Sequence, residues 1–255
     1  LVLAGVLVHQ APEVRRAFSA AIDRQRLVDE IYDGRGLPMR HAGVPGVVAS
    51  IPVGEIGVGY SPDYARQQME ASTFRSCRLM PEIRFRVSSA DLSLRQAELL
   101  RDMWVEELDC PQEQIIIEQV QFGELLAGTL PDATGRPDLW ELAWAPTFPD
   151  THDLVTNLLH CRLSENRQLR PCSEADTLLE RASTAVDPAE RAELYHQAES
   201  LFFSEDGIFP IAPLYIRARY WVAQSWVTFT PVAFGGQQWD RIVLDAELKE
   251  LERSR

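Results

Sequence analysis

The sequence predicts an α/β fold built around three parallel strands with helices between them. Strand-type segments rich in apolar and β-branched residues occupy 82–87, 115–120 and 138–144. Helical patterns separate them at 94–108 and 122–130. A β-α-β-α-β order places neighbouring strands parallel, with right-handed crossovers. The chain has 255 residues, which is enough to bury a large core without covalent staples.

The residues before this core predict further elements in order. The opening LVLAGVLVHQ predicts a strand, and it lacks the basic start and cleavage motif of a signal peptide. We therefore interpret 1–10 as the continuation of a longer chain. Helical spacing predicts helices at 12–21 and at 61–71. Between them, a further helix is expected to begin after a cap at Asp23. Residues 37–59 hold three prolines and five glycines and predict a long irregular loop.

The residues after the core predict helices and then short strands. Helices are expected at 154–160 and 174–186, and a third begins at Asp187-Pro188, because Asp caps a helix and Pro favours its first turn. A buried apolar segment follows at 208–214. Strands are expected at 215–222, 226–229 and 239–244, and the charged tail is expected to fray.

Composition and motifs exclude several classes of function. The formal charge of −13 argues against a nucleic-acid partner, which requires basic patches. No nucleophile elbow, phosphate-binding loop or dinucleotide motif is present, so no enzyme, catalytic residue or cofactor is expected. The five histidines show no metal-ligand spacing, and no metal site is expected.

The four cysteines predict disulfides. No pair has CxxC spacing. Cys161 and Cys172 bracket a polar loop, which favours a bridge between them, with two buried thiols as the alternative. Cys77 and Cys110 each precede one of two consecutive parallel strands. Both therefore lie at the same edge of the sheet, and a second bridge, Cys77–Cys110, is a hypothesis from this topology.

A ligand site is predicted where the third parallel strand ends. The segment 138–153 alternates with period two and then enters a loop with Pro146 and Pro149. Ligands of open α/β sheets bind at the carboxyl ends of strands. The first candidates are Trp144, Ala145, Thr147 and Phe148.

Other candidates come from neighbouring segments. Ser89 and Phe122 follow the other two parallel strands, although Ser89 and its neighbour Ser88 could simply cap a helix. Tyr215 follows the buried apolar segment. For Trp144, burial in the core is the alternative to ligand contact.

Five stretches in the same order resemble family 5 extracellular solute-binding proteins, the peptide- and nickel-binding subunits of ABC importers. They are VRRAFSAAIDRQRLVDEIYDGRGLP (14–38), YSPDYARQQMEAS (60–72), RQAELLRDMWVEELDC with IIIEQVQFGELL (95–126), WAPTFPDTHDL (144–154) and the run from DPAERAELYHQ to YIRARYWV (187–222).

The resemblance implies the fold and the division of the chain. It implies a type II periplasmic-binding-protein-like lobe and a match to the carboxyl-terminal half of the family. Residues 1–10 would connect from a missing amino-terminal lobe, 11–225 would form the carboxyl-terminal ligand-binding lobe (lobe III), and 226–255 would return to lobe I and end in the tail. Peptide-binding members often carry a cystine where Cys161 and Cys172 lie.

Two positions depart from the peptide-binding members. These members commonly place an Asp three residues after the Trp, to hold the α-amino group of the ligand; here the position is Thr147. Some place an Arg three residues before it, near a ligand carboxylate; here it is Glu141, which we include among the candidates. The resemblance therefore implies a solute more firmly than a peptide.

The expected function is the solute-binding component of an ABC-type importer, for a peptide or related small solute. The expected partners are that solute and a membrane permease, with the chain a monomer. The expected location is extracytoplasmic, periplasmic or lipid-anchored, with the signal segment outside this sequence. The alternative is a sensory or regulatory ligand-binding module that uses the same lobe.

Overall fold

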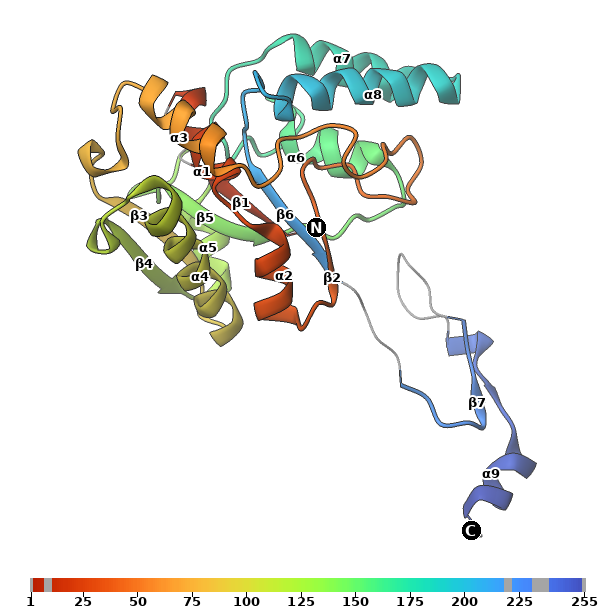
Figure 1. The fold of residues 1–255 in the computed structure, drawn as a ribbon. Coiled ribbons are helices and arrows are strands. Elements are labelled where there is room, and N and C mark those ends of the chain that lie inside the picture. The colour runs from red at the N-terminus through yellow and green to blue at the C-terminus, as the bar shows by residue number, and fades with distance from the viewer. Residues whose placement is uncertain (1, 7–10, 218–221, 231–238, 254–255) are drawn as a thin grey trace.

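A computed structural model describes residues 2–6, 11–217, 222–230 and 239–253. Its main body is a six-stranded mixed sheet with helices on both faces (Figure 1). The sheet order is β2-β6-β1-β5-β3-β4. Its strands are β1 (Val2–Val6), β2 (Gly36–Pro38), β3 (Ile83–Ser88), β4 (Ile115–Val120), β5 (Leu139–Ala143) and β6 (Ala212–Arg217).

The predicted parallel core is confirmed. Strand β3 pairs in parallel with both β4 and β5. The opening strand β1 lies in the middle of the sheet, antiparallel to β5 on one side and to β6 on the other. The sheet is therefore mixed, and residues 2–6 are an integral part of it.

The helices fall close to their predicted ranges. Those of the main body are α1 (Pro12–Ala20), α2 (Arg24–Tyr32), α3 (Pro62–Ala71), α4 (Asp91–Leu108), α5 (Phe122–Gly128), α6 (Asn157–Leu159), α7 (Glu174–Thr184) and α8 (Pro188–Phe203). A π-helical turn, His152–Thr156, precedes α6. Asp23 caps α2 by accepting hydrogen bonds from two backbone N–H groups, as the sequence predicts. Asp187 caps α8 by accepting a hydrogen bond from one backbone N–H group, which is also predicted.

Two layers of helices bury the two faces of the sheet. Helices α1 to α4 pack on one face, around Phe85, Leu139 and Trp104. The other face carries α5 to α8 and part of the loop 37–59. Leu139 belongs to the first layer and Trp140 to the second, since successive side chains of a strand point to opposite faces.

The irregular loop 37–59 is held by a buried carboxylate. Glu199 of α8 accepts hydrogen bonds from the backbone N–H groups of Ala42 (2.7 Å) and Gly43 (2.9 Å), and its Oε2 lies 3.2 Å from Nδ1 of His41. Both Glu199 and His41 are fully buried. These bonds replace the regular backbone pairing that the loop lacks.

Both predicted disulfides are present. Cys77–Cys110 joins the segments that lead into β3 and β4, in agreement with the hypothesis from the parallel topology. Cys161–Cys172 closes the polar loop between α6 and α7.

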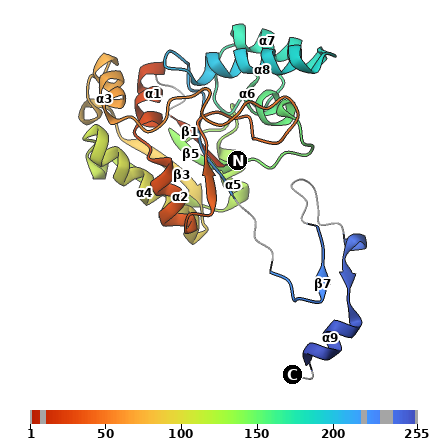
Figure 2. The ribbon, with the colours of Figure 1, turned by 45° about the vertical axis from the view of Figure 1, so that its right-hand side comes forward.

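The carboxyl-terminal segment lies apart from the six-stranded sheet in both ribbon views (Figures 1 and 2). It contains β7 (Val227–Thr228) paired with β8 (Val243–Leu244), and helix α9 (Ala246–Arg253). The expectation of a frayed tail is wrong, because most of the tail forms α9, in which Asp245 accepts from the backbone N–H of Leu248. Residues 218–221 of the strand predicted at 215–222 lie outside the described residues.

Arg24 joins the α1–α2 turn to the sheet. Its side chain is 4 % exposed and donates to the backbone carbonyls of Pro213 (2.7 Å), Ser19 (3.1 Å) and Ile22 (3.2 Å). It also donates to the Ser19 hydroxyl (2.9 Å). Burial lowers the pKa of Arg24 to about 10. The guanidinium therefore serves several buried acceptors at once.

Replacing Arg24 is expected to destabilise the fold strongly. Arg24→Met leaves buried carbonyl groups without donors, so the free energy of unfolding should fall by roughly 3 kcal/mol or more. Urea denaturation at neutral pH measures it. The matched control is Arg26→Met, two residues away, where exposed ion pairs with Glu30 and Glu106 should contribute at most about 1 kcal/mol. Equal losses for the two variants would contradict the assignment.

Candidate functional site

A pocket of about 260 Å³ lies beside the carboxyl-terminal half of β5. Its apolar wall comes from Trp140, Leu142 and Trp144 of β5 and the segment just after it, together with Leu158 of α6. Its polar wall is the loop segment 165–168. The volume is slightly below the range of roughly 300–1,000 Å³ typical of whole-ligand sites, so the pocket fits one group of a ligand.

The alternation of β5 builds the apolar wall. Trp140 is 1 % exposed and packs against Leu125 of α5. Arg136 lies over the Trp140 ring at 5.7 Å from its centroid. Leu142 and Trp144 continue on the same face and pack against the layer of α6 to α8. Trp144 is half-buried, with part of its surface open to the pocket.

The cystine loop forms the polar wall. Cys161–Cys172 closes it covalently, and Arg170 of the loop pairs with Asp176 of α7, with Nη1 2.8 Å from Oδ2. Asp176 also accepts from the backbone N–H groups of Cys161 (2.8 Å) and Ser173 (2.7 Å). Burial opposes ionisation of Asp176, but these hydrogen bonds outweigh it and lower its pKa to about 2. The wall is thus fixed by a covalent bond and a buried ion pair.

A cluster in this loop resembles a metal site in composition only. Ligand atoms of His160, Cys161 and Asp176 lie within 4.8 Å of one another. The Cys161 sulfur is bonded to Cys172, and the Asp176 carboxylate is bonded to Arg170. Nδ1 of His160 accepts from the backbone N–H groups of Arg162 and Leu163. These possible metal-ligand atoms are therefore already bonded within the protein, where they hold the loop in place.

The loop after β5 is held by two carboxylates. Asp153 is buried and accepts from the backbone N–H of Thr147 and from Asn157 Nδ2 (2.7 Å). Asp150 accepts two hydrogen bonds from Arg191, at 2.7 and 2.8 Å. Burial would raise the pKa of Asp150, but the bonds from Arg191 and from the backbone N–H of His152 lower it overall.

The predicted site residues fall into three groups. Trp144 lines the pocket, and Ala145, Thr147 and Phe148 follow it in an exposed stretch of the loop. Phe148 stacks on His152 with ring centroids 6.5 Å apart.

Two other candidates are exposed but lie outside the pocket lining. They are Ser89, between β3 and α4, and Phe122, at the start of α5. The neighbouring hydroxyl of Ser88 lies 2.8 Å from that of Ser93, in the turn leading into α4. The cap residue of α4 is Ala90, without a side-chain hydrogen bond, so neither serine caps the helix and the capping alternative is wrong.

Glu141 and Tyr215 lie on the opposite face of the sheet from Trp144. Both are buried, and the Tyr215 hydroxyl donates to Gln96 Oε1 and lies 2.7 Å from the hydroxyl of Tyr32. Burial raises the pKa of Glu141 to about 7, against a hydrogen bond from Gln96 and the charge of Arg217. An odd separation of three residues along a strand places Glu141 and Trp144 on opposite faces.

Sequence reasoning missed the opposite wall of the pocket. That wall consists of the loop residues Glu165, Asn166, Arg167 and Gln168, and Leu158, which completes the apolar wall, was missed as well. Their signal was the polar stretch bracketed by Cys161 and Cys172, which predicted a closed loop but not its position against β5.

Comparison with known proteins finds curated relatives that are named for binding peptides. The oligopeptide-binding protein OppA of Bacillus subtilis is 22 % identical over 221 residues, which are 82 % of this chain and 38 % of OppA. Di/tripeptide-binding protein 4 of Pseudomonas aeruginosa is 32 % identical over 118 residues, 45 % of this chain and 22 % of the relative. No family model matches the chain.

Solved structures share the fold. The Escherichia coli murein tripeptide binding protein MppA matches with a TM-score of 0.77 at 16 % identity, over 95 % of this chain and 48 % of its own. DppA from Helicobacter pylori, in complex with the peptide STSA, matches with a TM-score of 0.73 at 16 % identity, over 95 % of this chain and 46 % of its own.

The chain is related to the family 5 solute-binding proteins. The predicted resemblance is confirmed, and so is the periplasmic-binding-protein-like lobe. The curated relatives are named for the oligopeptides or the di- and tripeptides that they bind. The chain spans 38 % of the length of OppA and 22 % of the length of di/tripeptide-binding protein 4.

The buried Glu141 is expected to make stability depend on pH. Its pKa is raised from 4.5 to about 7, so the folded state retains a proton that the unfolded chain releases. Below about pH 4.5, the raised pKa of Glu141 does not reduce the free energy of unfolding. The reduction grows as the pH rises from about 4.5 to about 7, and above pH 7 it stays at about 3 kcal/mol. Glu141→Gln should therefore stabilise the protein at pH 8 and have little effect at pH 4.5.

Urea denaturation of the wild type and of Glu141→Gln at both pH values measures this difference. Glu118→Gln is the matched control, because Glu118 is half-buried and its carboxylate pairs with Arg86 at 2.8 Å. A stability difference between wild type and Glu141→Gln that is the same at pH 4.5 and pH 8 would contradict the assignment.

Proposed function

We propose that this chain is the carboxyl-terminal, ligand-binding lobe of the solute-binding component of an ABC-type importer. The observation that carries the proposal is the pocket formed by Trp140, Leu142 and Trp144 against the cystine loop. It lies at the carboxyl end of a strand in a chain related to proteins named as peptide-binding. The solute class that fits best is a short peptide or a related small molecule.

The pocket would take an apolar or aromatic group of the solute. Its β5 wall is aromatic, and aromatic walls bind such groups by burial and ring contact. The exposed loop from Ala145 to Phe148 would contact the remainder of the solute. Thr147 offers a hydroxyl where a carboxylate would hold an ammonium group, and such a bond is weaker than a charge-assisted one.

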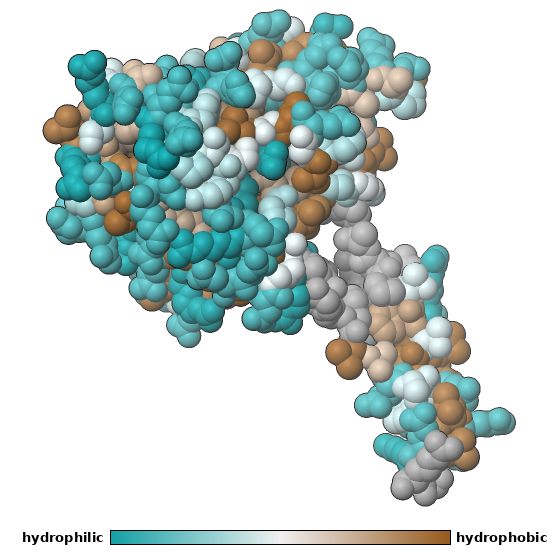
Figure 3. Space-filling model, viewed as in Figure 1, coloured by the Kyte–Doolittle hydropathy of each residue, from teal (hydrophilic) through white to brown (hydrophobic). Residues whose placement is uncertain are grey.

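The mechanism would be a clamp of two lobes. Solute would lie between this lobe and a second one outside this sequence, and closure at the hinge would bury it. Residues 11–225 would form the lobe, with 1–10 leading in. Residues 226–255 would return to lobe I, which fits the exposed Trp239, Val243 and Leu244 in that segment. Figure 3 shows hydrophobic residues on the surface of the carboxyl-terminal segment.

The partner of the loaded, closed form would be a membrane permease, and the protein would act as a monomer outside the cytoplasm. Solved relatives are described as periplasmic. In the part of the chain that the structure describes, no helix has the length and apolarity to cross a membrane.

The second candidate is a sensory module that uses the same lobe to detect a solute. Its pocket chemistry would be identical, so only the segments joined to the lobe distinguish the two roles. A receiver, kinase or DNA-binding segment in the full-length product would favour the sensor, and a signal peptide would favour the importer.

Solute binding by residues 1–255 is expected to be weak and to depend on Trp144. NMR of the indole N–H signals should show Trp140 and Trp144 shifting with di- and tripeptides at millimolar concentration, and not with sugars. Trp144→Ala should abolish the remaining indole shift of Trp140. The matched control is Trp239→Ala, an exposed tryptophan of the carboxyl-terminal segment.

Calorimetry measures the affinity of the isolated chain for a solute and so tests the two-lobe mechanism. In the proposed clamp the second lobe would lie outside this sequence, so micromolar binding by the isolated chain would contradict the two-lobe mechanism. Peptide-induced shifts that persist unchanged in Trp144→Ala would contradict the pocket assignment.

A further inference from the structure

A groove lies along the outer edge of β4, which is the strand at one end of the sheet. Strand β4 is the last in the sheet order and, within the described residues, pairs only with β3. Along its other side it presents unpaired backbone N–H and C=O groups, which form a template for another strand. Its sequence, IIIEQV, contains none of the Pro or Lys residues that usually block such an edge.

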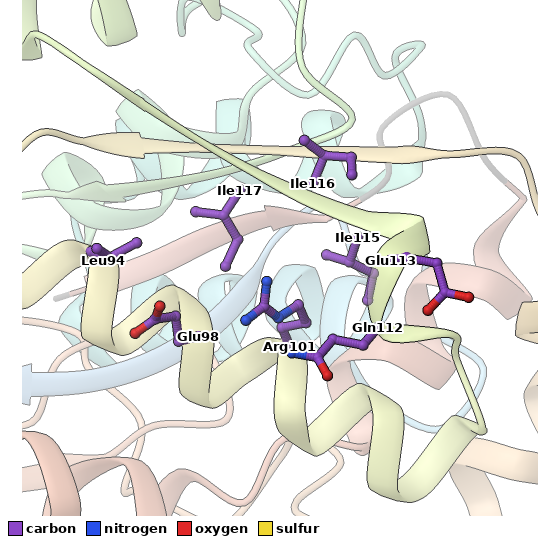
Figure 4. A pocket seen from close by; sticks show the side chains of 8 residues that line it. All are labelled: Leu94, Glu98, Arg101, Gln112, Glu113, Ile115, Ile116 and Ile117. Carbon is purple, nitrogen blue, oxygen red and sulfur yellow. The ribbon is translucent and has the colours of Figure 1, made fainter.

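The groove, of about 580 Å³, lies between this edge and α4 (Figure 4). Its floor is apolar and comes from Leu94 of α4 and from Ile115 and Ile117 of β4. Ile116 is 38 % exposed and points to the other face of the same edge. A strand added along the β4 edge would bury apolar side chains of β4 on both faces of the sheet.

Arg101 places a guanidinium group in the groove without an acidic partner among the described residues. Figure 4 shows its side chain extending from α4 toward Ile115 and Ile117. Its Nε is buried without a hydrogen-bond partner, and no ion pair joins the guanidinium to a carboxylate among residues 2–6, 11–217, 222–230 and 239–253. A partly desolvated guanidinium forms strong bonds with a carboxylate.

Glu98 and Glu113 border the same groove on either side of Arg101. A purely acidic partner would be repelled by these carboxylates. Glu98 and Arg101 are separated by roughly 4.5 Å along the helix axis, and alternate residues of a strand by about 6.7 Å. An occupant with one acidic side chain, flanked two residues away on each side by a basic one, complements the three charges.

We propose that the α4–β4 groove binds an extended segment of a partner protein, which pairs with the β4 edge and presents a basic-x-acidic-x-basic face to Arg101. Backbone pairing provides affinity and the alternating side chains provide specificity, as in other strand-addition sites. This site is separate from the solute pocket and its test is independent of solute binding.

The probe is the capped peptide Lys-Val-Glu-Val-Lys, titrated into the isotope-labelled chain at physiological salt. Saturable NMR shifts are expected in β4 and along Leu94 to Arg101. The control peptide Val-Lys-Glu-Lys-Val has the same composition but loses the alternation, and it should bind at least roughly fivefold more weakly. Shifts that are absent, or that lie elsewhere, would overturn the proposal.

The variant Arg101→Glu tests the charge pairing directly. It should weaken Lys-Val-Glu-Val-Lys by roughly fivefold or more and favour Lys-Val-Lys-Val-Lys, because three carboxylates then line the groove. Arg95→Glu is the matched control, because it makes the same charge change at an exposed position of α4 outside the groove. Arg101→Gln covers the case in which the reversal perturbs folding, and it should weaken the first peptide without favouring the second.

Equal effects of Arg101→Glu and Arg95→Glu would show only a general charge effect and overturn the site. Sedimentation velocity on the unliganded chain tests the other occupant of the edge. A dimer that dissociates on Ile116→Lys would assign the edge to a second copy of the chain and would likewise overturn the proposal.

Discussion

The period-two alternation of β5 determines on which face of the sheet the proposed solute pocket lies. This strand lies between β1 and β3, and helices cover both faces of the sheet, so each buried side chain of β5 belongs to one of the two layers. Trp140, Leu142 and Trp144 face α5 to α8 and form the pocket wall. Glu141 faces the other layer, where burial raises its pKa to about 7. A shift of one residue in register would exchange these two sets.

The second wall depends on bonds that do not belong to the sheet. The loop between α6 and α7 has little regular structure, yet the Cys161–Cys172 bridge and the Arg170–Asp176 pair hold it at both ends. Conformational entropy would otherwise oppose a fixed loop of this length. The pocket therefore combines a rigid strand with a loop made rigid by covalent and ionic contacts.

Much of the fold could be predicted from the sequence because its strongest signals are local. The alternation at 82–87 and 138–144 and the caps at Asp23 and Asp187 each specify structure within a few residues. The Cys77–Cys110 bridge followed from the parallel topology alone. The position of β1 in the middle of the sheet did not, because antiparallel pairing to distant strands leaves no local pattern.

The candidate site was predictable only in part, for the same reason. Trp144 could be located from the end of β5, but Leu158 and the loop 165–168 reach it through long-range packing. Glu141 was chosen from the family position and not from the alternation, although the alternation already assigned it to the other face. Tyr215 was chosen from its place after a buried segment, and its hydroxyl is used within the core by Tyr32 and Gln96.

A crystal structure of the chain with a bound di- or tripeptide tests the central claim most directly. The account predicts ligand density against Trp140, Leu142 and Trp144 and beside the loop closed by Cys161–Cys172. Peptide density confined to the face covered by α1 to α4, or absent from the β5 pocket in a crystal with peptide bound elsewhere, would contradict it.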